Sequence, residues 1–305
     1  MKIHSRKIKE DFESYFADLE KSVRDSLKKH GEAETPNLFK AAYPLFVMLE
    51  TLSNSDYFLD PSKQIELDKC IENGDKKRII AARRRLFNST TKMSEELRRG
   101  LADQLFTPYF KELYSDTFLL INQYYLNNYR GCYLYLRCIL EDLYKHVYYK
   151  DHEQEFYMVT SERVSEYALK ITPQFLRSYL ERALQLRQLK TFNYTLEKHD
   201  DANKEQNKDT MFNLNDRLYS ETSAFVHPSG KTFMSHFTSN SDLVYEEKRA
   251  QEVLNSTKDV INIVILFLIC VHFQQFCRFN EYEKNLVIMG FDKKTKRNLR
   301  INFGV

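Results

Sequence analysis

The sequence predicts an all-α fold, a multi-helix bundle, and three observations support this prediction. The 305 residues include only 7 Gly and 6 Pro, whereas average usage would give roughly twenty and fifteen. Glycine supplies the positive φ angles that tight turns need, so its scarcity disfavours hairpin-rich folds. Four prolines directly follow Thr or Asp, which is the pattern of a helix start. These pairs are Thr35-Pro36, Asp60-Pro61, Thr107-Pro108 and Thr172-Pro173. Apolar residues also recur at intervals of three and four, the period of a helix.

The N-terminal part is expected to be helical. The first helix should span residues 3–30 and end at Gly31, a residue type that favours helix C-caps. Its apolar stripe consists of Ile8, Phe12, Phe16, Leu19, Val23 and Leu27. A helix pair is expected around residues 38–52, broken or kinked at Pro44, because proline removes a helical hydrogen bond.

Further helices follow along the chain. Expected spans are 62–72, 75–87, 94–106, 108–126, 129–149, one beginning near 161, 173–189, 211–227 and 246–279. The spans 108–126 and 129–149 should form an antiparallel pair, because only two Asn residues separate them. Residues 197–210 are polar and charged and are expected to form a loop. Short apolar runs at 285–291 and 298–303 are typical of strands, so a small C-terminal β-hairpin is expected.

The expected domain organisation follows from these elements. Residues 1–105 form an N-terminal helical region, 106–280 a helical bundle, and 281–305 a tail with the possible hairpin. Within the bundle, Val260–Phe273 is an apolar run of about fourteen residues. A helix that spans a membrane needs roughly twenty, so the run is better explained as a core helix than as a membrane span.

Composition excludes several classes of protein. Neither a dinucleotide-binding G-x-G-x-x-G nor a P-loop occurs in the sequence. With 46 basic and 43 acidic residues, the net charge of +3 does not demand a polyanionic partner. The 5 Cys include no C-x-x-C pair, and no His or Cys spacing matches a metal site. We therefore expect no metal, no cofactor and a cytoplasmic location, since the N-terminus lacks a signal peptide.

Two segments carry the candidate site residues. In the first, Arg137 and Glu141 stand four residues apart on an apolar helix rich in tyrosine. They form either an ordinary helix ion pair or a partly buried pair facing a cleft. In the second, Arg217 precedes His227, which closes the expected helix 211–227. His227 is either a capping histidine favoured by the helix dipole or a general acid or base.

These two segments resemble the HEPN-like helical bundles of bacterial defence and toxin systems. The matching pieces are Leu136–Glu141, an Arg-x-x-x-Glu on an apolar helix, and Tyr219–Ser229, a helix end with Phe-Val-His-Pro-Ser. The resemblance covers about residues 108–280. It implies a bundle that dimerises and, in active members, cleaves RNA without a metal, with a His and an Arg acting on the 2′-OH and the scissile phosphate.

The usual motif of active members is an Arg followed by a His after four to six residues. His227 has no Arg at that spacing, and the match in this chain is Arg24 with His30. A basic cluster could contact phosphates or could be a solvated helix face. It comprises Lys76, Lys77, Arg83, Arg84 and Arg85.

The function expected from this resemblance is an antiviral-defence or toxin-type effector acting on RNA, a metal-independent ribonuclease. His227, Arg217, Arg137 and Glu141 are its candidate catalytic residues. The alternative is a non-catalytic interaction subunit of a multi-protein bacterial defence complex. Expected partners are RNA or a larger protein, in a homodimer or a hetero-complex. A third, weaker hypothesis is a membrane-associated effector that uses Val260–Phe273.

Overall fold

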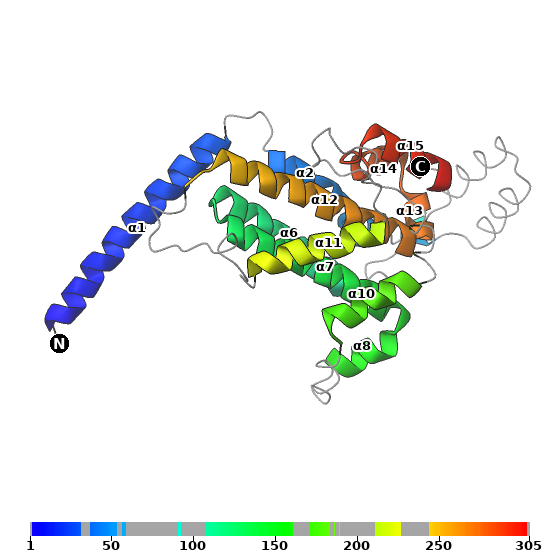
Figure 1. Ribbon diagram of the computed structural model, residues 1–305, viewed down its shortest axis with the longest axis horizontal. Coiled ribbons are helices and arrows are strands. Elements are labelled where there is room, and N and C mark those ends of the chain that lie inside the picture. Colours follow the sequence, from blue (N-terminus) through cyan, green and yellow to red (C-terminus); the bar gives the residue numbers. More distant parts are fainter. Residues whose placement is uncertain are drawn as a thin grey trace, which may run out of the picture. The chain divides into compact units, whose positions relative to one another are not determined.

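The computed structural model describes residues 2–31, 37–53, 57–58, 91–92, 108–160, 171–183, 186, 189, 211–226 and 244–303. Within these ranges it has eleven helices, which confirms the all-α prediction (Figure 1). They are α1 (Lys2–His30), α2 (Asn37–Ser53), α6 (Pro108–Tyr125), α7 (Tyr129–Asp151), α8 (Glu153–Thr160), α10 (Pro173–Arg182), α11 (Met211–Val226), α12 (Glu247–Val271), α13 (Phe273–Arg278), α14 (Glu281–Val287) and α15 (Lys293–Phe303). The helices expected at 62–72, 75–87, 94–106 and near 161, and the loop at 197–210, lie outside the described residues.

Contacts within the chain divide it into two compact units. One unit joins Met1–Glu50 with Pro108–Val305, and the other is Thr51–Thr107. In the second unit, β1 (Tyr57–Phe58) pairs antiparallel with β2 (Thr91–Lys92). The expected division at residues 105 and 280 stays a prediction.

Local signals explain where several helices start and stop. Thr172 caps α10 because its hydroxyl accepts a hydrogen bond from the Phe175 N–H at 3.2 Å, with Pro173 in the first turn. The first helix, α1, ends where predicted, and the Gly31 N–H bonds the Leu27 carbonyl at 2.8 Å. In contrast, α2 runs unbroken through Pro44, so one helix replaces the expected pair. Its buried face offsets the hydrogen bond that proline removes.

The centre of the larger unit is α7, which packs against α6, α10, α11 and α12 (Figure 1). The predicted antiparallel pair of α6 and α7 is confirmed. Asn127 turns the chain with a φ of 57°, and Asn128 caps α7 by accepting a hydrogen bond from the Gly131 N–H at 3.0 Å. At the far end of the pair, the Tyr109 and Tyr149 rings stack 6.0 Å apart.

The core is densest along α12, whose residues 259–271 are all buried. An 18-residue stretch of this helix is apolar enough to cross a membrane, and 89% of it is buried within the protein. The core-helix interpretation of Val260–Phe273 therefore agrees with the structure. The expected single helix 246–279 is instead interrupted at His272, which separates α12 from α13.

The predicted C-terminal hairpin is wrong, because both segments lie in or beside helices. Asn280 and Glu283 form a reciprocal capping box that starts α14. Asp292 then starts α15, since its Oδ1 accepts hydrogen bonds from the N–H groups of Lys294 at 2.7 Å and Thr295 at 3.0 Å. A short apolar run cannot distinguish a buried helix from a strand, and these caps decide the outcome.

Candidate functional site

The predicted pair on α7 is an ion pair that is mostly shielded from solvent. Arg137 Nε lies 2.8 Å from Glu141 Oε1, and the side chains are 19% and 21% exposed. Burial alone would lower the pKa of Arg137, but the neighbouring carboxylate outweighs it and raises that pKa. Arg137 therefore stays positively charged. The pair is therefore partly buried, and its orientation toward a cleft stays a prediction.

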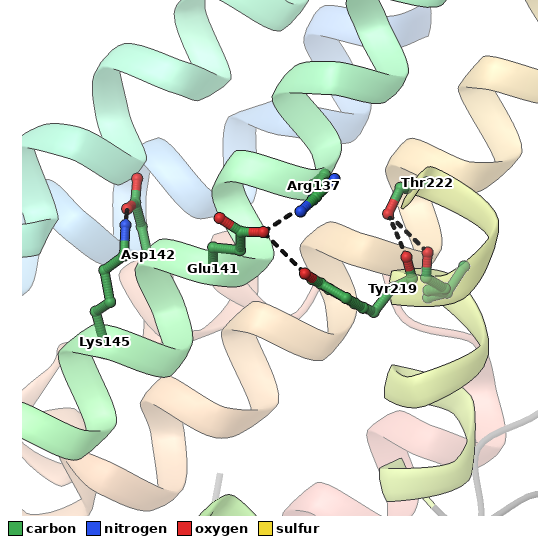
Figure 2. Close-up of polar contacts among 7 residues, drawn as sticks. Arg137, Glu141, Asp142, Lys145, Tyr219 and Thr222 are labelled. Atoms are coloured by element: carbon green, nitrogen blue, oxygen red, sulfur yellow. Dashed lines mark hydrogen bonds and ion pairs between the residues drawn. The ribbon is translucent and has the colours of Figure 1, made fainter. Parts of the chain in front are cut away.

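Tyr219 of α11 completes the arrangement (Figure 2). Its hydroxyl donates to the same Glu141 Oε1 at 2.9 Å, and the Arg137 guanidinium carbon lies 5.5 Å from the centre of its ring. Burial raises the pKa of Tyr219, and the Glu141 carboxylate adds to this effect. One carboxylate oxygen thus orients both the guanidinium and the phenol.

A second arginine reaches the same tyrosine from another helix. Arg177 of α10 places its guanidinium carbon 4.5 Å from the Tyr219 ring centre, and its Nη1 lies 3.1 Å from Asp216 Oδ1. Its side chain is 24% exposed, and its Nε is buried without a hydrogen-bond partner. Tyr219 is therefore close to two guanidinium groups, each held by a carboxylate. We call Arg137, Glu141, Arg177, Asp216 and Tyr219 the arginine–tyrosine cluster.

A buried hydrogen bond fixes the helices behind this cluster. The Tyr144 hydroxyl donates to Asn215 Oδ1 at 2.8 Å, and both side chains are buried. Complete burial raises the pKa of Tyr144 well above its ordinary value. Further along the two helices, the Phe225 ring stacks on Tyr133 at 3.7 Å. The contacts show that α11 runs antiparallel to α7, so the position of Tyr219 beside Glu141 is set by the core.

The other two predicted catalytic residues belong to α11 and to the segment that follows it. Arg217 is half-buried and precedes Tyr219 by two residues, a rotation of about 200° around α11. It therefore starts from the side of α11 opposite to Tyr219. His227 follows Val226, the last described residue of α11, and lies outside the described residues. The basic residues Lys76, Lys77, Arg83, Arg84 and Arg85 also lie outside them.

Among the described residues, the two members of the Arg24–His30 match to the ribonuclease motif have different partners. Arg24 Nη2 pairs with Glu20 Oε1 at 2.6 Å on an exposed surface. His30 instead hydrogen-bonds Asn127 Oδ1 through Nε2 at 3.1 Å. Its ring lies within about 5 Å of three tyrosine rings, those of Tyr124, Tyr125 and Tyr245. Burial lowers the pKa of His30, and the bond to Asn127 partly opposes this.

Comparison with known proteins adds no family assignment. Profiles of known families, curated protein sequences and solved structures all gave no match. Within the described parts of the chain, no group of three or more His, Cys, Asp or Glu side chains is placed to hold a metal ion. The all-helical fold is the part of the HEPN-like expectation that the structure shows.

Sequence reasoning missed three members of the arginine–tyrosine cluster. Arg177, Asp216 and Tyr219 come from two helices far from Arg137 in the sequence. A tyrosine that precedes the Phe-Val-His segment is visible in the sequence, but nothing links it to Glu141 before the helices pack. The residues around Arg177 do not mark it as a site residue. They indicate only that it follows the helix start at Thr172-Pro173.

Replacing Glu141 should destabilise the protein more than replacing an exposed acid. In Glu141→Ala, the shielded Arg137 guanidinium and the Tyr219 hydroxyl both lose their acceptor. We expect the free energy of unfolding in urea to fall by about 1–3 kcal/mol. Glu20→Ala is the matched control, because its pair with Arg24 is 69–77% exposed. That variant should change stability by less than about 0.5 kcal/mol. Equal effects would contradict a structural role for Glu141.

Proposed function

We propose that this chain is an RNA-acting effector of the antiviral-defence or toxin type, and that the arginine–tyrosine cluster contacts the RNA. One observation carries the proposal: two guanidinium groups, from α7 and α10, lie within 6 Å of the ring of Tyr219. Arginine binds phosphate through planar, paired N–H donors, and the side chains of Arg137 and Arg177 keep 19% and 24% exposure. Because Glu141 and Asp216 hold both arginines, the donors are fixed before RNA arrives.

The proposed reaction is a transesterification within the RNA strand. The 2′-oxygen attacks the adjacent phosphorus, a new P–O2′ bond forms, and the P–O5′ bond breaks. A general base of the protein takes the proton of the 2′-OH, and the leaving 5′-oxygen takes up a proton from water. The products are a 2′,3′-cyclic phosphate and a 5′-OH end. His227 is the proposed proton acceptor, and arginine stabilises the charge that develops on the phosphate.

Binding and cleavage of a labelled single-stranded RNA test this proposal. Arg177→Gln should weaken RNA binding about tenfold, because a charge-assisted hydrogen bond is lost. It should also lower the slope of log affinity against log salt by about 1. Arg249→Gln is the control, since Arg249 pairs with Glu246 at 2.9 Å on an exposed part of α12. His227→Ala should abolish formation of the cyclic phosphate while RNA binding persists.

Two results would contradict the proposal. One is wild-type protein that neither binds nor cleaves total RNA under any tested condition. The other is an equal loss of binding in Arg177→Gln and Arg249→Gln, which would place the RNA away from the cluster. Circular dichroism on each variant would separate these results from a loss of fold.

The alternative function, a non-catalytic interaction subunit of a bacterial defence complex, is favoured by a different observation. Aromatic side chains on α2 and α6 remain exposed: Phe39 is 42% exposed, Tyr114 49% and Phe118 54%. Exposed apolar patches of this kind mark protein–protein contact surfaces. Copurification of an unrelated protein from native cells, together with absent RNA binding, would support this function instead.

A further inference from the structure

The C-terminal helix α15 is held to the rest of its unit by one face and by its first turn. Leu299 and Thr295 are 0% and 2% exposed, so this face of α15 packs within the protein. The Lys296 ammonium donates to the Met289 carbonyl oxygen at 3.0 Å. Asp292 closes the first turn, where its Oδ1 accepts a hydrogen bond from the Thr295 N–H at 3.0 Å. These contacts fix the orientation of α15 on the protein.

The opposite face of α15 is basic. Among residues 293–300, the four exposed side chains are all cationic, namely Lys293, Lys294, Arg297 and Arg300. Successive helix residues are about 100° apart, so these four positions fall within a sector of about 120°. Thr295 and Leu299 lie on the other side of the helix, and α15 contains no acidic residue. Four positive charges therefore share one solvent-facing surface, which we call the α15 basic face.

The charges of the α15 basic face are unfavourable for the helix by itself. Lys293 and Lys294 stand in the first turn, where the helix dipole is positive and basic residues destabilise. A bound polyanion would relieve this repulsion. From Lys293 to Arg300 the helix rises about 10 Å, and one nucleic-acid strand carries about three phosphates over that length. The face thus matches a short run of a phosphate backbone.

We propose that the α15 basic face binds the phosphate backbone of RNA, at a surface separate from the arginine–tyrosine cluster. Lys and Arg side chains neutralise phosphates, and such contacts position a strand without reading its bases. The face should therefore bind RNA and DNA of the same sequence equally well. The inference rests on the proposed function for the identity of the polyanion as RNA, but it uses no residue of that cluster.

An anionic membrane fits this helix less well than a nucleic acid. A helix that lies in a membrane interface inserts an apolar face among the lipids. The apolar side of α15 includes Leu299, which is 0% exposed because it packs within the protein. The surface that α15 offers to a ligand is therefore one of charge, as in contacts to a phosphate backbone.

The salt dependence of binding measures how many phosphates the face neutralises. The full chain is titrated against a labelled single-stranded RNA, and against DNA of the same sequence, between about 50 and 200 mM salt. In Lys293→Gln/Arg297→Gln/Arg300→Gln, the slope of log affinity against log salt should become shallower by about 2, because each phosphate contact contributes about 0.7. The affinity for both strands at low salt should fall at least about tenfold.

The matched control is Lys21→Gln/Arg24→Gln/Lys28→Gln on α1. These three side chains are also exposed, and they follow one helix face at spacings of three and four. Asp25 lies among them, and Arg24 pairs with Glu20 at 2.6 Å, so their charge is locally offset. The control removes the same total charge and should bind nearly as well as wild type, which separates the α15 basic face from an effect of net charge.

Four results would overturn the inference. They are wild-type protein that binds neither RNA nor DNA, an equal loss of affinity in the two triple variants, an unchanged slope in the α15 variant, and binding of phosphatidylserine vesicles in place of nucleic acid. Arg297→Gln alone should make the slope shallower by about 0.7, which gives a second measurement should circular dichroism show that the triple variant folds poorly.

Arg177→Gln distinguishes the failure of this inference from the failure of the proposed function. If Arg177→Gln weakens RNA binding and the α15 variant does not, the inference about α15 is wrong and the role of the arginine–tyrosine cluster stands. If the α15 variant weakens the binding of both RNA and DNA and Arg177→Gln does not, the inference is confirmed and the role of the cluster is wrong.

Discussion

Removing the buried histidine pair is expected to make the protein much more resistant to acid. His146 of α7 and His272, between α12 and α13, are 0% and 6% exposed, and their Nε2 atoms lie 2.8 Å apart. One neutral ring must donate this hydrogen bond and the other must accept it. The Phe110 ring lies 4.7 Å and 5.4 Å from the two imidazole rings, and Lys150 is the nearby cation that disfavours their protonation.

The direction of the pH effect follows from the lowered pKa values. Burial lowers the pKa of His272 to about 3, with Lys150 adding to the effect. Burial and then His272 lower the pKa of His146 well below its ordinary value. The unfolded chain therefore takes up protons first as the pH falls through about 6.5. The stability from the neutral pair is complete above that pH and is lost below it, at up to about 1.4 kcal/mol per pH unit for each histidine.

A comparison of wild type with His146→Leu/His272→Leu isolates this contribution. Urea unfolding at intervals between pH 7.5 and pH 4.5 should show the two stability curves diverging below pH 6.5, with the double variant favoured at low pH. Replacing both partners avoids the buried, unbonded nitrogen of a single variant, which would cost about 1–3 kcal/mol at pH 7. Leu143→Ala controls for general destabilisation, since it should shift the curve equally at every pH. Parallel curves for wild type and the double variant would contradict the argument.

The pH dependence of wild-type stability alone would not reveal the histidine effect. The carboxyl pair of Asp116 and Asp142 acts in the opposite direction, because it stabilises the folded protein as the pH falls. Burial and the neighbouring Asp142 raise the pKa of Asp116 to about 7. Since an unfolded Asp titrates near 4, the folded protein takes up this proton first, and its protonation adds stability as the pH falls from about 7 towards 4. The double variant retains Asp116 and Asp142, so their contribution cancels in the difference between the two curves.

The sequence predicted those features that depend on local spacing. The limits of α1, the cap at Thr172 and the antiparallel pair of α6 and α7 all follow from residues close together in the chain. The ion pair of Arg137 and Glu141 belongs to the same class, because four residues separate its members on one helix. Helical geometry alone brings such groups into reach.

Features that depend on packing between distant segments could not be predicted. Tyr219 meets Glu141 only after α11 has docked on α7, 78 residues away in sequence. His272 interrupts the expected last helix at a position where its ring bonds that of His146, 126 residues before it. The hairpin prediction for the C-terminal tail was wrong for another reason. Its short apolar runs fit the period of a strand as well as that of a helix, and the side-chain cap of Asp292 determined the helix.

Phe267→Ala is expected to be among the most destabilising single changes in the described core. Phe267 lies on α12, is 0% exposed, and meets Phe212 of α11 edge to face with ring centres 5.8 Å apart. Removing the ring loses its burial and leaves a cavity that the rigid helices around it fill only in part. We expect a loss of about 3–5 kcal/mol, against a total of about 5–15 kcal/mol for a typical domain. Urea unfolding followed by circular dichroism measures it.

The matched control for this change is Phe118→Ala on α6. The same ring is removed there, but Phe118 is 54% exposed, so the stability should change by less than about 0.5 kcal/mol. The pair of variants also distinguishes a core role for α12 from a membrane role. If α12 faced lipid, Phe267→Ala would leave the unfolding of the remaining bundle nearly unchanged, and the protein would sediment with membranes. A large loss of stability in Phe267→Ala, without a similar loss in Phe118→Ala, is expected only if α12 holds the other helices together.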